Sequence, residues 1–412
     1  MVYPRHVCIS NRTQYVILIP VFYHKFRARN NEKPQIMKNP LQKIFSSLGG
    51  LANASQSGSA IGIDIGTSAI KVVEIKKKGG KAVLETYGAI SLGPYAETDA
   101  GRVTNLPVDK LSEALKEVLK QSGVEGSACG VAIPVQSSLI FTIDLPSQVR
   151  KSEMPSIVPT EARKYIPVPI NEVSLDYFIL PEKAPSFEEM NNPDVHISSG
   201  DKTHVLVVAT QNDAVSRFRS IASQASIAAS FFEIEVFSSV RSNFQHELSP
   251  VLLMDLGASR TKLSIVEFGT VKAYHTIDRG GADMTDSIAR SLNIPFYEAE
   301  KMKKEFGLFD NPKDKSVPDI IKIHTDYIFS ETNNVLLNYE KKYNRTISKV
   351  IITGGGALLK GFRELALNNF RAEVELGKPF SKIGTPEFLE KVLETMGPEF
   401  AVAIGLALRK LQ

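Results

Sequence analysis

Two aspartates, Asp64 and Asp255, each stand at the end of a short apolar strand and just before a glycine turn. In the first of these stretches (IGIDIGTSAIKVVEI), isoleucines alternate with glycine and aspartate, which is the period of a strand with one buried face. Residues 66–68 then reverse the chain, and Lys71 lies on the returning strand. Glycine lets a backbone approach a ligand closely, and successive turn N–H groups can surround phosphate oxygens. A carboxylate just before such a turn is placed to hold the hydrated Mg²⁺ of that phosphate.

The second stretch (VLLMDLGASRTKLSIV) repeats this hairpin. After Asp255, the glycine and serine of the first turn recur as Gly257 and Ser259, and Lys262 takes the place of Lys71. One such hairpin alone would equally fit an ordinary tight turn with a solvated aspartate. Chance copies of both the strand and the turn are improbable, so the repeat indicates two related halves that face one ligand.

A third element is the apolar strand that runs into the triple glycine 354–356 and is followed by a helix. Three consecutive glycines leave no side chain in the way, so a flat ligand or its phosphate can lie directly on the backbone. A triple glycine is common in loops, but a strand, three glycines and a helix behind two D-x-G hairpins form a much rarer combination.

With these three elements the chain resembles the actin-like ATPase superfamily, whose signature is two phosphate loops and one adenosine loop. It resembles more closely the PilM family of type IV pilus assembly, which is related to the division protein FtsA. The resemblance covers about residues 59–412 and implies an α/β, two-lobed actin-like (ribonuclease-H-like) ATPase fold with an inserted small α+β subdomain. The limits that we expect are 1–58 for a disordered tail and linker, 59–138 for the first part of the first lobe, 139–205 for the inserted subdomain, 206–250 for the rest of the first lobe, 251–396 for the second lobe, and 397–412 for a C-terminal helix that returns to the first lobe.

The resemblance implies ATP and Mg²⁺ as cofactors, bound between the lobes, with Asp64 and Asp255 holding the metal through water. It places Gly280 and Gly281 beside the phosphates and the helical residues Glu300 and Lys303 beside the ribose. Glu300 and Lys303, one helical turn apart, also fit a solvated surface ion pair. The cofactor-binding residues that we expect are Asp64, Gly66, Thr67, Ser68, Lys71, Asp255, Gly257, Ser259, Gly280, Gly281, Glu300, Lys303, Gly354, Gly355 and Gly356.

Glu235 is the best positional match in this chain for the residue that orients the attacking water in the superfamily, with Glu233 as the second choice. A carboxylate that reaches the γ-phosphate can polarise water. An acidic residue at a helix N-terminus, stabilised by the helix dipole, is an equally good interpretation of Glu235. We therefore expect weak or no ATPase activity.

The stretch EARKYIPVP is the part of the chain that most resembles PilM, and it lies in the expected inserted subdomain. Its prolines favour an extended path that displays apolar side chains, so Tyr165, Ile166 and Val168 are the expected partner-binding residues. The resemblance implies that they bind the cytoplasmic N-terminal segment of a PilN-like membrane protein; other pilus platform proteins or self-association are also possible partners. A packed connector is the alternative for this stretch. For the whole chain, the alternatives are a small-molecule kinase of the same superfamily and an FtsA-like filament-forming division protein.

The composition, with 43% hydrophobic and 23% charged residues, is that of a globular protein. The net charge of +4 arises in the first 60 residues, and the remainder has 41 basic against 44 acidic residues, which gives no reason to expect nucleic-acid binding. Two cysteines suit a reducing compartment, and no apolar run is long enough to span a bilayer. We expect a cytoplasmic protein recruited to the inner face of the membrane. We also expect Met37 to be the true start, with residues 1–36 an over-extended gene model, and residues 1–36 to be dispensable.

Overall fold

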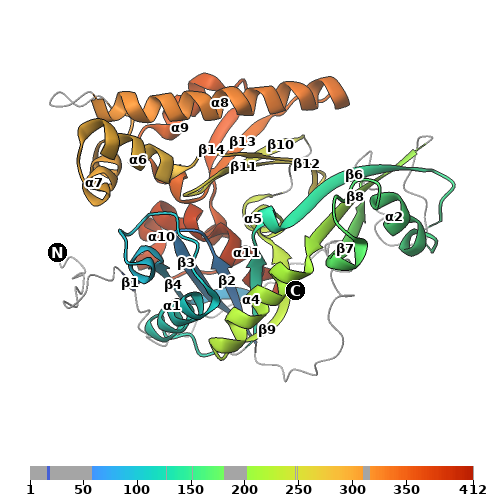
Figure 1. Cartoon of the computed structure of the whole chain (residues 1–412), viewed down its shortest axis with the longest axis horizontal. Helices are drawn as coiled ribbons and strands as arrows, with labels where there is room; N and C mark the ends of the chain where they lie inside the picture. The colour runs from blue at the N-terminus through green and yellow to red at the C-terminus, as the bar shows by residue number, and fades with distance from the viewer. Residues whose placement is uncertain are drawn as a thin grey trace.

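The computed structural model describes residues 16–18, 58–126, 128–150, 152–180, 202–245, 247, 249–309 and 316–411. Their strands form three sheets: two large sheets, each with its own helices, and a smaller third sheet. Figure 1 shows the second large sheet above the first, with the small sheet extending to the right. No helix in these ranges is long and apolar enough to cross a bilayer.

The first lobe is built on a mixed sheet in the order β1-β4-β3-β2-β5-β9. Its strands are β1 (Val16–Leu18), β2 (Ser59–Ile65), β3 (Ala69–Lys78), β4 (Lys81–Ser91), β5 (Ala128–Ile133) and β9 (Ala228–Ile234). Strands β2, β3 and β4 form the antiparallel meander, whereas β5 runs parallel to β2 and β9 parallel to β5.

Helices cover both faces of this first sheet. On one face, α1 (Val108–Gln121) and α4 (Asn212–Gln224) bury a core that includes Ile61, Ile63 and Leu115. On the other face lies α11 (Ala401–Leu411), close to α5 (Glu235–Asn243). A Cβ on Gly62 would lie 1.8 Å from the carbonyl oxygen of Ala403, so glycine is required for the close approach of α11 to β2.

The second lobe repeats this design. Its sheet has the order β12-β11-β10-β13-β14, from β10 (Val251–Leu256), β11 (Thr261–Glu267), β12 (Thr270–Ile277), β13 (Lys349–Thr353) and β14 (Glu373–Leu376). As in the first sheet, a three-stranded antiparallel meander is followed by two parallel strands. The repeat seen in the two hairpins therefore extends to the order and direction of five strands in each lobe.

One face of the second sheet is covered by four helices that share one apolar core. They are α6 (Gly281–Leu292), α7 (Phe296–Phe306), α8 (Ser316–Tyr343) and α9 (Phe362–Asn369). The rings of Phe329 and Phe362 lie 5.2 Å apart in this core, where α8 meets α9. In Figure 1, α8 runs along the top of the molecule. Helix α10 (Glu390–Met396) precedes α11. Short 3₁₀ turns lie at η2 (Gly93–Ala96), η3 (Val135–Ser137), η4 (Ile170–Glu172), η5 (Gly355–Leu358), η6 (Pro379–Lys382), η7 (Glu387–Leu389) and η8 (Gly397–Phe400).

The small sheet lies between β5 and α4 in the sequence. It is antiparallel, in the order β6-β8-β7, from β6 (Ser138–Pro146), β7 (Val173–Ile179) and β8 (Lys202–Gln211). Helix α2 (Met154–Ala162) packs on one face, over Ile143, Val205 and Val207. Strand β8 belongs to this sheet over its whole length, so the unit extends a few residues beyond the range 139–205 expected from the sequence.

The N-terminal segment contributes one short strand to the first lobe. Residues Val16–Leu18 (β1) pair antiparallel with residues 88–90 of β4 at the edge of the sheet. These three residues are part of the fold, contrary to the expectation for 1–58. The rest of residues 1–57, including Met37, lies outside the described residues.

Candidate functional site

The two hairpins place their charged residues in the same register. In the first, Asp64 of β2 lies opposite Lys71 of β3, and in the second Asp255 of β10 lies opposite Lys262 of β11. The same backbone hydrogen bond closes both turns. It runs from the glycine N–H to the carbonyl three residues later, at 3.0 Å in the first turn and 2.9 Å in the second. The predicted repeat is therefore present in the backbone as well as in the sequence.

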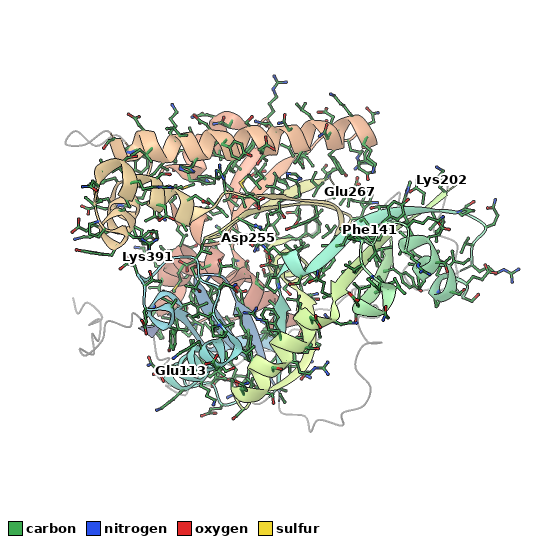
Figure 2. The ribbon with its side chains drawn as sticks, in the orientation of Figure 1. Glu113, Phe141, Lys202, Asp255, Glu267 and Lys391 are labelled. Atoms are coloured by element: carbon green, nitrogen blue, oxygen red, sulfur yellow. The ribbon has the colours of Figure 1, made fainter. Side chains whose placement is uncertain are left out.

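The two turns face each other across the two lobes. The hydroxyl of Thr67 donates a hydrogen bond to the hydroxyl of Ser259, with the oxygens 3.3 Å apart. Figure 2 shows Asp255 at the junction of the lobes. Gly66 and Thr67 are exposed, so the first turn is open to solvent.

The triple glycine lies against the end of β10, beside Asp255. Gly354 has a φ of +84°, and a Cβ there would lie 2.3 Å from Oδ1 of Asp255. A Cβ on Gly356 would lie 2.3 Å from Cγ of Leu256. Packing against β10 therefore requires glycine at these two positions. At Gly355 the nearest atom to such a Cβ, in Glu399, is 3.7 Å away, so packing does not require glycine there.

The N-terminus of α6 packs on the second turn. The N–H of Gly281 donates to the carbonyl of Gly257, and the N–H of Ala282 donates to the carbonyl of Ala258, both at 2.9 Å. A Cβ on Gly280 would lie 2.4 Å from the carbonyl oxygen of Ala258. The two glycines thus lie beside the second turn.

The side chains of Glu300 and Lys303 on α7 are only 15% and 12% exposed, so they form a largely buried pair rather than a solvated one. Lys303 Nζ lies 2.7 Å from Glu300 Oε2, and it donates to the carbonyl of Gly281 at 2.8 Å and to the hydroxyl of Thr285 at 2.7 Å. Burial alone would raise the pKa of Glu300, but Lys303 and Lys304 hold it below its usual range. Burial lowers the pKa of Lys303, and Glu300 opposes this effect. The pair ties α7 to the start of α6.

A second link between the lobes lies next to this pair. Arg102, in the loop after η2, lies 3.3 Å from Asp286 of α6, and its guanidinium lies 4.1 Å from the ring centre of Phe296 on α7. The neighbouring Gly101 approaches Glu300, because a Cβ on it would lie 3.5 Å from Cδ of that glutamate. The first lobe thus closes over one side of the site.

Lys262 joins the carboxylates at the centre of the site. Its Nζ lies 2.6 Å from Glu235 Oε2 and 3.5 Å from Asp255 Oδ2. Although burial alone would lower the pKa of Lys262, Glu235 and Asp255 raise it well above its usual value. Lys262 was absent from the site residues expected from the sequence. Its match to Lys71 in the hairpin register was the signal that could have identified it.

Asp64 is the buried carboxylate of the first hairpin. Burial, partly offset by Lys71, raises its pKa to about 6, and the nearby Glu235 acts in the same direction. A buried charge that is only partly neutralised is the kind of group that a hydrated Mg²⁺ stabilises. In the described residues, no group of three His, Cys, Asp or Glu side chains could hold a metal by itself.

Glu233 has a structural role. Its fully buried carboxylate is bound by Arg241 of α5 at 2.7 Å and by Arg409 of α11 at 2.8 Å, and it accepts a hydrogen bond from Ser238. Both of its oxygens are used in holding β9, α5 and α11 together. Glu233 is therefore a poor candidate for orienting water.

The three expected partner-binding residues differ in exposure. Tyr165 is 55% exposed, and its ring lies 5.2 Å from that of Phe141 on β6. Ile166, by contrast, is only 9% exposed, and it packs with Val168 in the core of the small sheet. The idea that the prolines display all three side chains is thus wrong for Ile166, because the stretch turns that residue inward under α2.

Comparisons with a family model and with solved structures point to the same family. Residues 62–411 match the family model described as type IV pilus assembly protein PilM. A solved PilM-PilN type IV pilus biogenesis complex is similar with a TM-score of 0.71 and 25% identity, over 86% of this chain and 98% of that one.

The curated relatives are cell division proteins. FtsA of Staphylococcus epidermidis is 27% identical over 175 residues, which is 37% of each chain. FtsA of Helicobacter pylori is 24% identical over 251 residues, which is 54% of this chain and 50% of that protein. The chain thus spans between about a third and a half of the length of these relatives.

Proposed function

Because the chain belongs to the PilM family of type IV pilus assembly proteins, we propose that it is a nucleotide-binding platform protein of pilus assembly. It binds ATP with Mg²⁺ between its two lobes and docks the cytoplasmic N-terminal segment of a PilN-like inner-membrane protein. This partner recruits it to the inner face of the membrane. The two-lobed actin-like fold expected from the sequence is confirmed, whereas the ligand and the partner are proposals.

The observation that carries the nucleotide proposal is the convergence of three glycine-containing elements on one point. The turns at Gly66 and Gly257 face each other, and the triple glycine lies beside Asp255. Backbone N–H groups in such turns bind phosphate oxygens. Gly355, which packing does not constrain, offers backbone against which a flat ring can lie.

The charged side chains take complementary roles in this site. Asp64 and Asp255 hold the waters of the metal, Lys71 and Lys262 offset the negative charge, and the buried pair Glu300–Lys303 keeps the start of α6 in place beside the ribose. When bound, Mg²⁺ neutralises phosphate charge.

We expect little or no ATP hydrolysis. Glu235, the candidate for orienting water, has both carboxylate oxygens in use: Oε2 binds Lys262 at 2.6 Å, and Oε1 accepts the N–H of Val135 at 3.0 Å. A carboxylate held in this way is not free to position a water molecule at a γ-phosphate.

The docking proposal rests on the small sheet and on the solved relative, which is a PilM-PilN complex. An apolar patch on this sheet consists of Leu139 and Phe141 of β6 and the adjoining Tyr165. Leu139 is 38% exposed and Tyr165 is 55% exposed, and Figure 2 shows Phe141 on the arm formed by the small sheet. An aromatic side chain exposed beside other apolar groups is typical of a site that binds an extended segment through a few anchors.

The test is binding of a fluorescently labelled peptide, the cytoplasmic N-terminal segment of the PilN-like protein, measured by anisotropy with and without Mg-ATP. We expect saturable, micromolar binding. No binding in either state would remove the platform function while leaving the nucleotide site to be judged on its own measurement. In that case the kinase alternative would gain weight.

A further inference from the structure

A loop of the first lobe reaches the second lobe beside the candidate site. It comprises residues 92–106, here called the strap, which follow β4, contain η2 and lead to α1. Both ends of the strap are fixed to the first lobe. The N–H of Leu92 donates to the carbonyl of Ser68 at 2.9 Å, and the guanidinium of Arg217 on α4 donates to the carbonyl of Leu106 at 2.7 Å. The middle of the strap can therefore contact the other lobe while its ends stay in place.

The middle of the strap is held on the corner between α6 and α7. Arg102 Nη1 lies 3.3 Å from Asp286 Oδ1 on α6, and the guanidinium stands 4.1 Å from the ring centre of Phe296, the first residue of α7. Within the strap, Arg102 also lies 3.8 Å from Asp99. A guanidinium can pair with a carboxylate and stack on a ring at the same time. Arg102 thus joins the first lobe to the two helices whose residues we expect beside the phosphates and the ribose.

The strap also contacts the first turn of the site. The carbonyl of Thr67 accepts two hydrogen bonds from Thr104, one from the N–H at 2.9 Å and one from the hydroxyl at 3.0 Å. Gly101 has a φ of +92°, which side chains disfavour, and it lies close to Glu300 of α7. The strap therefore runs from the turn of the first hairpin to the helix that carries the expected ribose-side pair.

We propose that Arg102 is a positioning residue that controls how fast nucleotide enters and leaves the site, because it holds the strap on α6 and α7 and so keeps the ribose side of the site closed. This inference rests on the proposed function, since it concerns the nucleotide site of that proposal. Arg102 acts through the strap and not by contact with the nucleotide.

This role affects rates and leaves affinity unchanged. Entry and release of nucleotide both require the strap to leave α6 and α7. The contacts of Arg102 are made within the protein, so they have the same strength whether or not nucleotide is bound. Weakening them therefore speeds entry and release by the same factor. The dissociation constant stays as it is, because the nucleotide has no differential interaction with the two positions of the strap.

The contacts of Arg102 suit a closure that opens repeatedly. The side chains of Arg102 and Asp286 are 37% and 42% exposed, so solvent screens their attraction. Phe296 is only 2% exposed, and its ring is a fixed surface on which the guanidinium can settle again. A partly exposed ion pair together with one cation–π contact corresponds to an effect of about fivefold on a rate constant.

The test is rapid filtration of the full chain with radiolabelled ATP and Mg²⁺, which gives the association and dissociation rate constants separately. The label leaves the ribose unmodified, so the ligand does not disturb the strap. In Arg102→Gln we expect both rate constants to rise about fivefold and the dissociation constant to stay unchanged. Asp286→Asn removes the ion pair from the other lobe and keeps the ring contact, so it should raise both rate constants by a smaller factor.

Two further variants make the test specific to the link between the lobes. Arg219→Gln is the matched control, because the guanidinium of Arg219 on α4 lies 5.7 Å from the ring centre of Phe232 on β9, within the first lobe; both rate constants should stay unchanged. In Arg102→Asp combined with Asp286→Arg, the exchanged charges can pair again. Both rate constants should then fall below those of Arg102→Asp alone.

The outcomes separate this inference from the proposed function. Unchanged rate constants in Arg102→Gln, or a weaker dissociation constant with unchanged association, would overturn the role of Arg102 alone. The same holds if the exchanged pair is as fast as Arg102→Asp. An unmodified chain that binds no ATP would overturn the nucleotide site, and the role of Arg102 with it.

Discussion

The hydroxyl of Thr67 donates to the hydroxyl of Ser259 at 3.3 Å, across 192 positions of sequence. This contact joins the turn of one D-x-G hairpin to the turn of the other. The two sheets share the same order over five strands, so the two turns that meet here occupy equivalent positions in the two lobes. A ligand held between these turns would contact both lobes at once, so its affinity would depend on how the two lobes are positioned relative to each other.

Alanine substitutions in the triple glycine should differ in their effect on the stability of the fold. Gly354→Ala should lower stability by about 1–3 kcal/mol, because alanine would have to adopt a φ of +84° and its Cβ would approach Asp255 Oδ1. Gly355→Ala is the matched control, since its Cβ has room, and should change stability by less than about 1 kcal/mol. Thermal melts of both variants measure the difference. Equal melting temperatures would show that the close approach to β10 is wrong.

The buried cluster around Glu233 predicts a pH dependence. Burial alone would raise the pKa of Glu233, but Arg241 and Arg409 hold it below its usual range. Its stabilising contribution is therefore fully present above the unfolded pKa of about 4.3 and is lost as the pH falls through the folded value. Glu233→Gln should cost about 3–5 kcal/mol at pH 7, and less as the pH falls below about 4.

Melting temperatures from pH 3 to pH 8 check this expectation. The control is Glu113→Gln, which removes an exposed pair with Lys110 and should matter by no more than about 1 kcal/mol at any pH. If the loss in Glu233→Gln were the same at every pH, the charge of the glutamate would not be its source.

Replacing Asp64 should raise the stability of the folded chain and impair nucleotide binding. Burial raises its pKa to about 6, so the ionised carboxylate destabilises the folded chain above that pH. Asp64→Asn should then raise stability at pH 7.5 by about 1–3 kcal/mol, with no gain near pH 4, while the Mg²⁺ dependence of ATP binding is lost. A variant that melts lower than the unmodified chain at pH 7.5 would contradict this view of the site.

Two neighbouring residues of the small-sheet unit should affect different properties: Tyr165 the binding of the partner and Ile166 the stability of the fold. Tyr165→Ala should weaken binding of the partner segment by about fivefold or more without changing the melting temperature, because Tyr165 is exposed. Ile166→Asp should instead destabilise the small sheet by several kcal/mol, because it would bury a charge in its core. If Tyr165→Ala binds normally, the partner surface lies elsewhere on the chain.

The sequence predicted the backbone of the site well. The alternation of isoleucine with glycine and aspartate, and its recurrence with Gly257 and Ser259, follow from strand and turn geometry that depends on neighbouring residues. The two-lobed actin-like fold came from the resemblance, and the two similar sheets of the structure agree with it.

Features that depend on distant packing could not be predicted in this way. Nothing local indicates that Lys262 reaches Glu235, which is 27 positions away, or that Ile166 turns under α2. The pair Glu300–Lys303 has ordinary helical spacing, and only the packing of α7 on the start of α6 buries it. The neighbouring acids Glu233 and Glu235 differ for the same reason, because Arg409 of α11 binds the first and Lys262 of β11 binds the second.

Isothermal titration calorimetry of Mg-ATP tests the central claim most directly. We expect one site per chain in the unmodified protein. In Asp64→Ala and in Asp255→Ala, we expect weaker binding whose affinity is the same with Mg²⁺ and with EDTA. Binding of Mg-ATP by both variants with the affinity and metal dependence of the unmodified chain would contradict the assignment of the two hairpins as the nucleotide site.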